Sequence, residues 1–296
     1  LRDDSSETPA TSDSHIFAQS ITGQVYCISL ATGNILWQQE LGPRAARGFT
    51  GRVVIEQDLV LVGDAGCFAA FNRYVGQQQW IWPEDPLARI GSFYTAGTAV
   101  GSGVVLVGSD AETEGVVAVD VQTGRCRWRS GDSKNPRRGD CVFDRDFYFF
   151  SPRALVCLAG KTGQVKWMTP SDPWSHSAPL VHRSKVFAAG SSGDLQALDR
   201  ETGRELWRIQ LGKPLLTLAY NQTEPSGQLA SPVACGDTVL QASNDGNLYA
   251  VDAETGNIEW QHDFGIALTS TPVVSDDHIF MTTPDATLWK FKLDLL

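Results

Sequence analysis

The sequence predicts an all-β fold, a seven-bladed β-propeller built from four-stranded antiparallel blades. The first observation behind this prediction is a glycine followed four residues later by a tryptophan, which recurs at Gly33/Trp37, Gly76/Trp80, Gly124/Trp128, Gly163/Trp167, Gly203/Trp207 and Gly256/Trp260. The pairs are spaced by about forty to fifty residues, the period typical of propeller blades. The second observation is the alternating apolar strand that ends in a glycine turn, as in residues 244–260. Because the repeat runs from end to end, residues 1–296 are predicted to form one domain.

The blade boundaries follow from the repeat. We expect blades over residues 8–37, 50–80, 97–128, 140–167, 177–207, 231–260 and 271–293. Residues 271–280 match residues 8–17 position by position. Each stretch is therefore predicted to contain the inner strand of its blade and the beginning of the second strand. The last blade lacks a fourth strand, and residues 1–7 are placed to supply it and to close the ring.

Charge and hydropathy restrict the partners and the compartment. The 24 basic and 34 acidic residues give a net charge of −10, which argues against nucleic acid and against an anionic membrane surface. The apolar runs are too short to cross a bilayer. Residues 1–14 do not form a signal sequence, so any leader is expected to have been removed. The sequon at Asn221 predicts a glycan and a secreted or extracytoplasmic location.

The six cysteines are scattered along the chain without any Cys-x-x-Cys pair. This spacing argues against a zinc or thiol redox motif, and it leaves their disulfide pairing open. The acidic run at residues 110–114 has no calcium-loop spacing and is interpreted as a solvated turn.

The best copies of the repeat, residues 195–207 and 248–260, resemble the pyrroloquinoline-quinone-type propeller repeat. The resemblance covers the whole chain. It implies blades and not one activity, since that family includes quinone dehydrogenases, an outer-membrane assembly lipoprotein, sensor domains and propellers without quinone. The dehydrogenases carry adjacent cysteines over the quinone and a bound calcium, and the lipoprotein carries a lipidated cysteine at its mature N-terminus. This chain has no Cys-Cys pair and no cysteine in residues 1–20. We therefore expect no cofactor, with the quinone and Ca²⁺ as the alternative.

A candidate site is predicted at the channel mouth, where loops join the outer strand of one blade to the inner strand of the next. Large polar, aromatic and basic residues gather in these loops. The predicted catalytic residues are His176, Arg47 and Arg138, and the predicted substrate-binding residues are Trp174, Tyr94, Phe93, Tyr220 and Gln228. His176 stands immediately before an inner strand, and histidine exchanges protons near neutral pH. Taken singly, the arginines also fit solvated loop charges and Phe93 fits a core cap.

The resemblance extends to secreted fungal hetero-Diels-Alderases, which implies a cofactor-free cyclase acting on a small apolar or aromatic organic substrate. In this hypothesis Trp174 and Tyr94 stack on the reactants, and Arg47 or Arg138 polarises a carbonyl. His176 would assist the loss of water. The alternatives are a non-catalytic binding or scaffold propeller and a quinone-dependent dehydrogenase.

Overall fold

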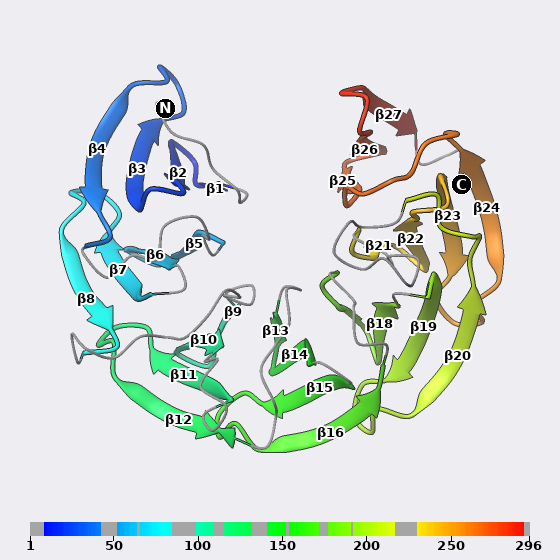
Figure 1. Ribbon diagram of the computed structural model, residues 1–296, viewed down its shortest axis with the longest axis horizontal. Helices are drawn as coiled ribbons and strands as arrows, with labels where there is room; N and C mark the ends of the chain where they lie inside the picture. Colours follow the sequence, from blue (N-terminus) through cyan, green and yellow to red (C-terminus); the bar gives the residue numbers. More distant parts are fainter. Residues whose placement is uncertain are drawn as a thin grey trace. The chain divides into compact units, whose positions relative to one another are not determined.

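The computed structural model describes residues 9–42, 52–63, 66–84, 99–108, 115–131, 141–151, 154–171, 177–190, 192–216 and 230–292. These residues form antiparallel strands arranged in seven sheets (Figure 1). Six sheets have four strands in chain order, and the last has three strands among the described residues. The predicted all-β class and the count of seven blades are confirmed. Residues 1–7, predicted to close a ring, lie outside the described residues.

The chain divides into two compact units. Unit 1 comprises Leu1–Pro136, Arg145–Phe147 and Ala159–Val165. Its three complete sheets are β1 (Ala10–Thr11), β2 (His15–Gln19), β3 (Gln24–Ser29) and β4 (Ile35–Glu40); β5 (Val54–Glu56), β6 (Leu59–Gly63), β7 (Phe68–Asn72) and β8 (Gln78–Trp82); and β9 (Ala99–Gly101), β10 (Val104–Gly108), β11 (Val116–Asp120) and β12 (Cys126–Ser130).

Unit 2 comprises Arg137–Asp144, Tyr148–Leu158 and Lys166–Leu296, which include most of the fourth sheet. The fourth sheet consists of β13 (Val142–Asp144), β14 (Asp146–Ser151), β15 (Ala154–Ala159) and β16 (Val165–Pro170). The fifth and sixth are β17 (Leu180–His182), β18 (Lys185–Ala189), β19 (Asp194–Asp199) and β20 (Glu205–Gln210), and β21 (Val233–Cys235), β22 (Thr238–Ala242), β23 (Asn247–Asp252) and β24 (Ile258–Asp263). The last sheet consists of β25 (Val273–Ser275), β26 (His278–Thr282) and β27 (Leu288–Lys292).

The core lies between neighbouring sheets. In unit 1, Phe17 of β2 and Phe71 of β7 belong to one buried cluster. In unit 2, Phe187 of β18 and Val251 of β23 do the same. The second and third strands of the first six sheets are largely buried, and most of their residues are apolar. The fourth strands are more exposed, and in β20 and β24 burial alternates along the second half of the strand because one face is solvated.

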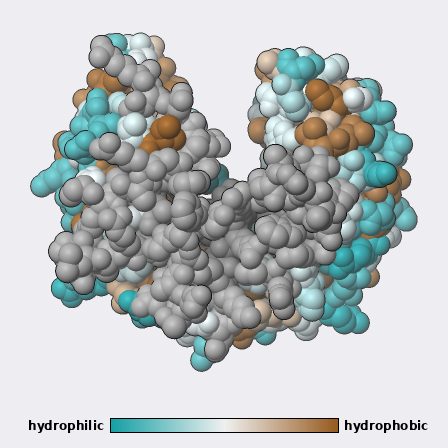
Figure 2. All heavy atoms as spheres, in the orientation of Figure 1, coloured by the Kyte–Doolittle hydropathy of each residue, from teal (hydrophilic) through white to brown (hydrophobic). Residues whose placement is uncertain are grey.

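The exposed residues along the outer strand β20 are mostly hydrophilic, and hydrophobic residues are exposed over the last sheet (Figure 2). In that sheet Val273 and Leu288 are exposed. The third strand β27 is largely exposed along its length, unlike the third strands of the other sheets. Among the described residues, no helix is long and apolar enough to cross a membrane.

Five of the six repeated tryptophans pack against a glycine of the next sheet. Trp167 of β16 donates its indole N–H to the carbonyl oxygen of Arg200 at 2.9 Å and lies against Gly203, which has a φ of +69°. A Cβ atom on Gly203 would stand 2.5 Å from Cδ2 of Trp167. The same contact to a left-handed glycine occurs at Trp37/Gly76, Trp80/Gly124, Trp128/Gly163 and Trp207/Gly256. The glycine is therefore required both for its backbone conformation and for the room that the indole needs.

Candidate functional site

The residues predicted to form the site lie outside the described part of the chain. These are the catalytic candidates His176, Arg47 and Arg138, the binding candidates Trp174, Tyr94, Phe93, Tyr220 and Gln228, and the glycosylation candidate Asn221. The acidic run at residues 110–114 lies outside it as well. Their convergence at a channel mouth stays a prediction.

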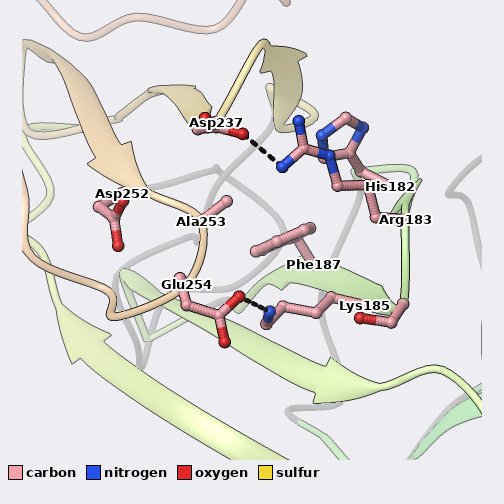
Figure 3. A pocket seen from close by; sticks show the side chains of 9 residues that line it. His182, Arg183, Lys185, Phe187, Asp237, Asp252, Ala253 and Glu254 are labelled. Atoms are coloured by element: carbon pink, nitrogen blue, oxygen red, sulfur yellow. Dashed lines mark hydrogen bonds and ion pairs between the residues drawn. The ribbon is translucent and has the colours of Figure 1, made fainter.

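The described residues do form a pocket of about 330 Å³ within unit 2 (Figure 3). It lies between the fifth and sixth sheets, at the turns that join β17 to β18, β21 to β22 and β23 to β24. The pocket is lined by His182, Arg183, Ser184, Lys185, Phe187, Asp237, Asp252, Ala253 and Glu254.

This pocket lies at turns within the sheets, whereas the predicted site was assigned to loops between sheets. Antiparallel strands reverse direction at each turn, so first-to-second and third-to-fourth turns share one end of a sheet, and the loops between sheets share the other. His182 is the last residue of β17, directly before the first of these turns. The pocket was missed because its charged residues belong to turns that repeat in every sheet.

Two ion pairs cross the pocket from the fifth sheet to the sixth (Figure 3). Arg183 pairs with Asp237, and both side chains are largely exposed, at 63% and 78%. Such an exposed pair contributes about 0–1 kcal/mol. Because both of its side chains are exposed, the Arg183–Asp237 pair is open to competition by another cation.

The second pair differs, since Lys185 is buried and its ammonium group pairs with the exposed carboxylate of Glu254.

Phe187 and Ala253 lie between the two ion pairs (Figure 3). Phe187 is fully buried and packs against the ring of Trp207, with 5.7 Å between the ring centres. Ala253 is also buried. The pocket thus combines an apolar floor with a charged rim.

The rim of the pocket carries more acidic than basic groups. Asp252 accepts hydrogen bonds from the hydroxyl of Thr255 at 2.6 Å and from its backbone N–H at 2.7 Å. These bonds, helped by the charge of Lys185, lower the pKa of Asp252 below its usual value. Three carboxylates and two basic side chains, together with His182, line the pocket, so its potential favours a cation.

The imidazole ring of His182 is held in place at the pocket by a hydrogen bond. Its Nε2 atom lies 3.0 Å from the carbonyl oxygen of Gly236 in the next sheet. Since a carbonyl oxygen only accepts, Nε2 carries the proton and donates. This bond ties the first turn of the fifth sheet to the first turn of the sixth. Within the described ranges, no group of three or more His, Cys, Asp or Glu side chains is placed to hold a metal ion.

Comparison with known proteins gives matches along the whole chain. A sequence profile of the family described as outer membrane protein assembly factor BamB matches residues 2–145, 112–225 and 192–294. The BamB protein of Moranella endobia is 31% identical over 117 residues, which cover 40% of this chain and 30% of that protein. The quinone alcohol dehydrogenase subunit of Komagataeibacter europaeus is 23% identical over 291 residues, covering 84% of this chain and 39% of that protein. The chain thus spans less than two thirds of the length of these relatives.

Among solved structures, BamB from Moraxella catarrhalis matches with a TM-score of 0.75 and 19% identity, over 99% of this chain and 84% of that chain. The propeller fold is therefore shared with that protein.

Proposed function

Because the chain belongs to the family described as outer membrane protein assembly factor BamB, we propose that it is a protein-binding propeller that assists the assembly of outer-membrane proteins outside the cytoplasm. The observation that carries this proposal is the family match, which extends over nearly the whole chain and not over a few blades alone. An extracytoplasmic location fits this role.

The described geometry supports binding. In the pocket of unit 2, exposed charged side chains surround a small apolar floor, an arrangement that suits recognition of a charged side chain. The turns that carry these side chains are joined to buried strands such as β18 and β23, and packing of these strands fixes the positions of the turns.

Deletion of the gene in the native host tests the proposal. We expect the amount of assembled outer-membrane proteins, quantified by mass spectrometry of purified outer membranes, to fall and to be restored by the wild-type gene. Unchanged levels of these proteins after deletion would contradict the proposal.

A quinone-dependent dehydrogenase is the second candidate, and the match to the Komagataeibacter europaeus subunit over 84% of this chain favours it. Purified protein would be mixed with pyrroloquinoline quinone, Ca²⁺, an alcohol and a redox dye. The assembly proposal predicts no dye reduction above the protein-free control, whereas the dehydrogenase reduces the dye at a rate proportional to protein concentration.

The cyclase hypothesis and the glycan at Asn221 stay predictions, because their residues lie outside the described part of the chain. None of the matches above is described as a cyclase. His176→Ala and Trp174→Ala would abolish a cyclisation catalysed at that mouth, and they are expected to leave outer-membrane protein levels unchanged.

A further inference from the structure

The pocket has a filled counterpart one sheet earlier. Arg200 and Ala253 occupy equivalent positions, each three residues before a left-handed glycine. The backbone N–H of Arg200 donates to the carbonyl oxygen of Ser184, and that of Ala253 donates to the carbonyl oxygen of Asp237, both at 2.9 Å. In both cases the residue's own carbonyl oxygen accepts the indole N–H of the tryptophan in the preceding sheet.

The guanidinium group of Arg200 fills the space between the fourth and fifth sheets. Nε donates to the hydroxyl of Tyr148 at 3.1 Å, and Nη1 donates to the carbonyl oxygen of Arg183 at 3.3 Å. Nη2 lies 3.0 Å from Oδ1 of Asp144. Burial opposes the charge of Arg200, but its hydrogen bonds to Asp144 and Tyr148 outweigh burial and raise its pKa. The charged arginine is thus the favoured occupant of this space.

Between the fifth and sixth sheets the equivalent position carries a shorter side chain and lines a pocket. Phe187 corresponds to Tyr148, since each ring leans on the tryptophan of its own sheet at similar distance and angle, 5.7 Å and 51° against 6.0 Å and 49°. Ala253 ends at Cβ where Arg200 continues to a guanidinium, and Ala253 lines the pocket of about 330 Å³.

The pocket keeps acceptors that can hold a guanidinium. Phe187 lines the pocket in the place of Tyr148, but its ring is fully buried, so an entering cation meets the carboxylates at the rim and not the face of the ring. Carboxylates of Asp237 and Glu254 replace that of Asp144 as acceptors at the rim. A guanidinium offers five N–H donors in one plane and so satisfies separate acceptors better than an ammonium group does.

We propose that this pocket receives an arginine side chain of a partner protein, which takes the place between the sheets that Arg200 takes one interface earlier. The identity of the ligand as part of a protein rests on the proposed assembly function. The recognition of a guanidinium rests on the pocket alone. The entering arginine competes with Arg183 for Asp237, an exposed pair that is weak enough to be exchanged.

Titration of the purified protein with short peptides tests the inference. The probes are acetyl-Gly-Arg-Gly-amide, the lysine analogue and the citrulline analogue, which has the shape of arginine without its charge. We expect the arginine peptide to bind with a Kd of about 1 mM, as suits a single side chain. The lysine peptide should bind several-fold more weakly, and the citrulline peptide should not bind. Equal affinity for the three peptides, or no binding of the arginine peptide at about tenfold higher concentration, would overturn the inference.

Two variants locate the binding. Ala253→Arg supplies the pocket with an arginine of its own and should abolish binding of the arginine peptide. Asp237→Asn, at an exposed position, should weaken binding severalfold without affecting the fold, which circular dichroism checks. Arg200→Ala is the matched control, because it opens the counterpart space beside Tyr148 and should raise the stoichiometry from one peptide per chain to two. Wild-type affinity in both Ala253→Arg and Asp237→Asn would place the peptide elsewhere and overturn the inference.

The two proposals fail in different experiments. If the arginine peptide does not bind while gene deletion still lowers outer-membrane protein levels, the arginine site is wrong and the assembly function stands. If the peptide binds as expected and deletion has no effect, the assembly function is wrong and the guanidinium pocket stands.

Discussion

The indole ring of Trp167 lies against the α-carbon of Gly203, so that a Cβ atom there would stand 2.5 Å from Cδ2 and 2.6 Å from Cε3 of the indole. Neither group has room to move far, because Trp167 is buried and its N–H is bonded to the carbonyl oxygen of Arg200. Contacts of this kind join neighbouring sheets within each unit, so a side chain added to such a glycine would have to displace the indole.

Gly203→Ala should destabilise the protein more than Gly33→Ala does. Both glycines have nearly the same left-handed φ, +69° and +72°, but a Cβ on Gly33 meets nothing within 4 Å. The left-handed backbone alone costs about 1–2 kcal/mol for a residue with a side chain. The displacement of Trp167 adds about 1–3 kcal/mol, as overpacking does. The midpoints of urea unfolding measure the difference, and equal midpoints for the two variants would contradict it.

Trp80→Phe should cost more stability than Trp128→Phe. The two indoles occupy equivalent positions in the second and third sheets. Nε1 of Trp80 donates to the carbonyl oxygen of Val121 at 2.8 Å, whereas within the described part of the chain the buried Nε1 of Trp128 has no hydrogen-bond partner. Both substitutions remove a similar apolar volume, so the net worth of one hydrogen bond, about 1 kcal/mol, separates them. A larger loss of stability for Trp128→Phe in chemical denaturation would contradict this assignment.

Tyr249 should make stability fall at alkaline pH. Burial first, and then the hydrogen bond of 2.7 Å from its hydroxyl to Oδ2 of Asp245, raise the pKa of Tyr249 from 10 to about 12. The unfolded chain releases this proton near pH 10 and the folded chain near pH 12, so the contribution is complete below pH 10 and is lost between pH 10 and 12. Spectrophotometric titration should show a late tyrosine phase that is missing in Tyr249→Phe. A wild-type titration identical to that of the variant, scaled by one tyrosine, would contradict the prediction.

Cys126 should react first with a thiol reagent. All six cysteines are free, and Cys126 is the exposed one. Burial raises the pKa of the Cys27 and Cys235 thiols, which lowers their fraction of reactive thiolate. With Ellman's reagent we expect one fast thiol per native chain, none in Cys126→Ser, and six in urea. Any fast thiol in native Cys126→Ser would contradict this prediction.

The sheets could be predicted because the features that build them are local. Gly203 and Trp207 mark the turn and the fourth strand of the fifth sheet within five residues, and the same spacing recurs in five other sheets. The alternation of β20 and the apolar run of β18 likewise follow from the exposure of each strand. The predicted site could not be judged in the same way, since His176 and its companions belong to loops outside the described residues.

The sequence by itself determined the repeats, because the turn before each of the first six fourth strands needs a left-handed glycine and a tryptophan follows that glycine by four residues. Only the tertiary structure decided where a ligand could enter. Lys185 and Glu254 are 69 residues apart and meet across two sheets. The exchange of arginine for alanine between Arg200 and Ala253 becomes a pocket only when the two sheets are packed side by side. The shape of the pocket depends on how the side chains of two neighbouring sheets pack, and these side chains come from segments far apart in the sequence.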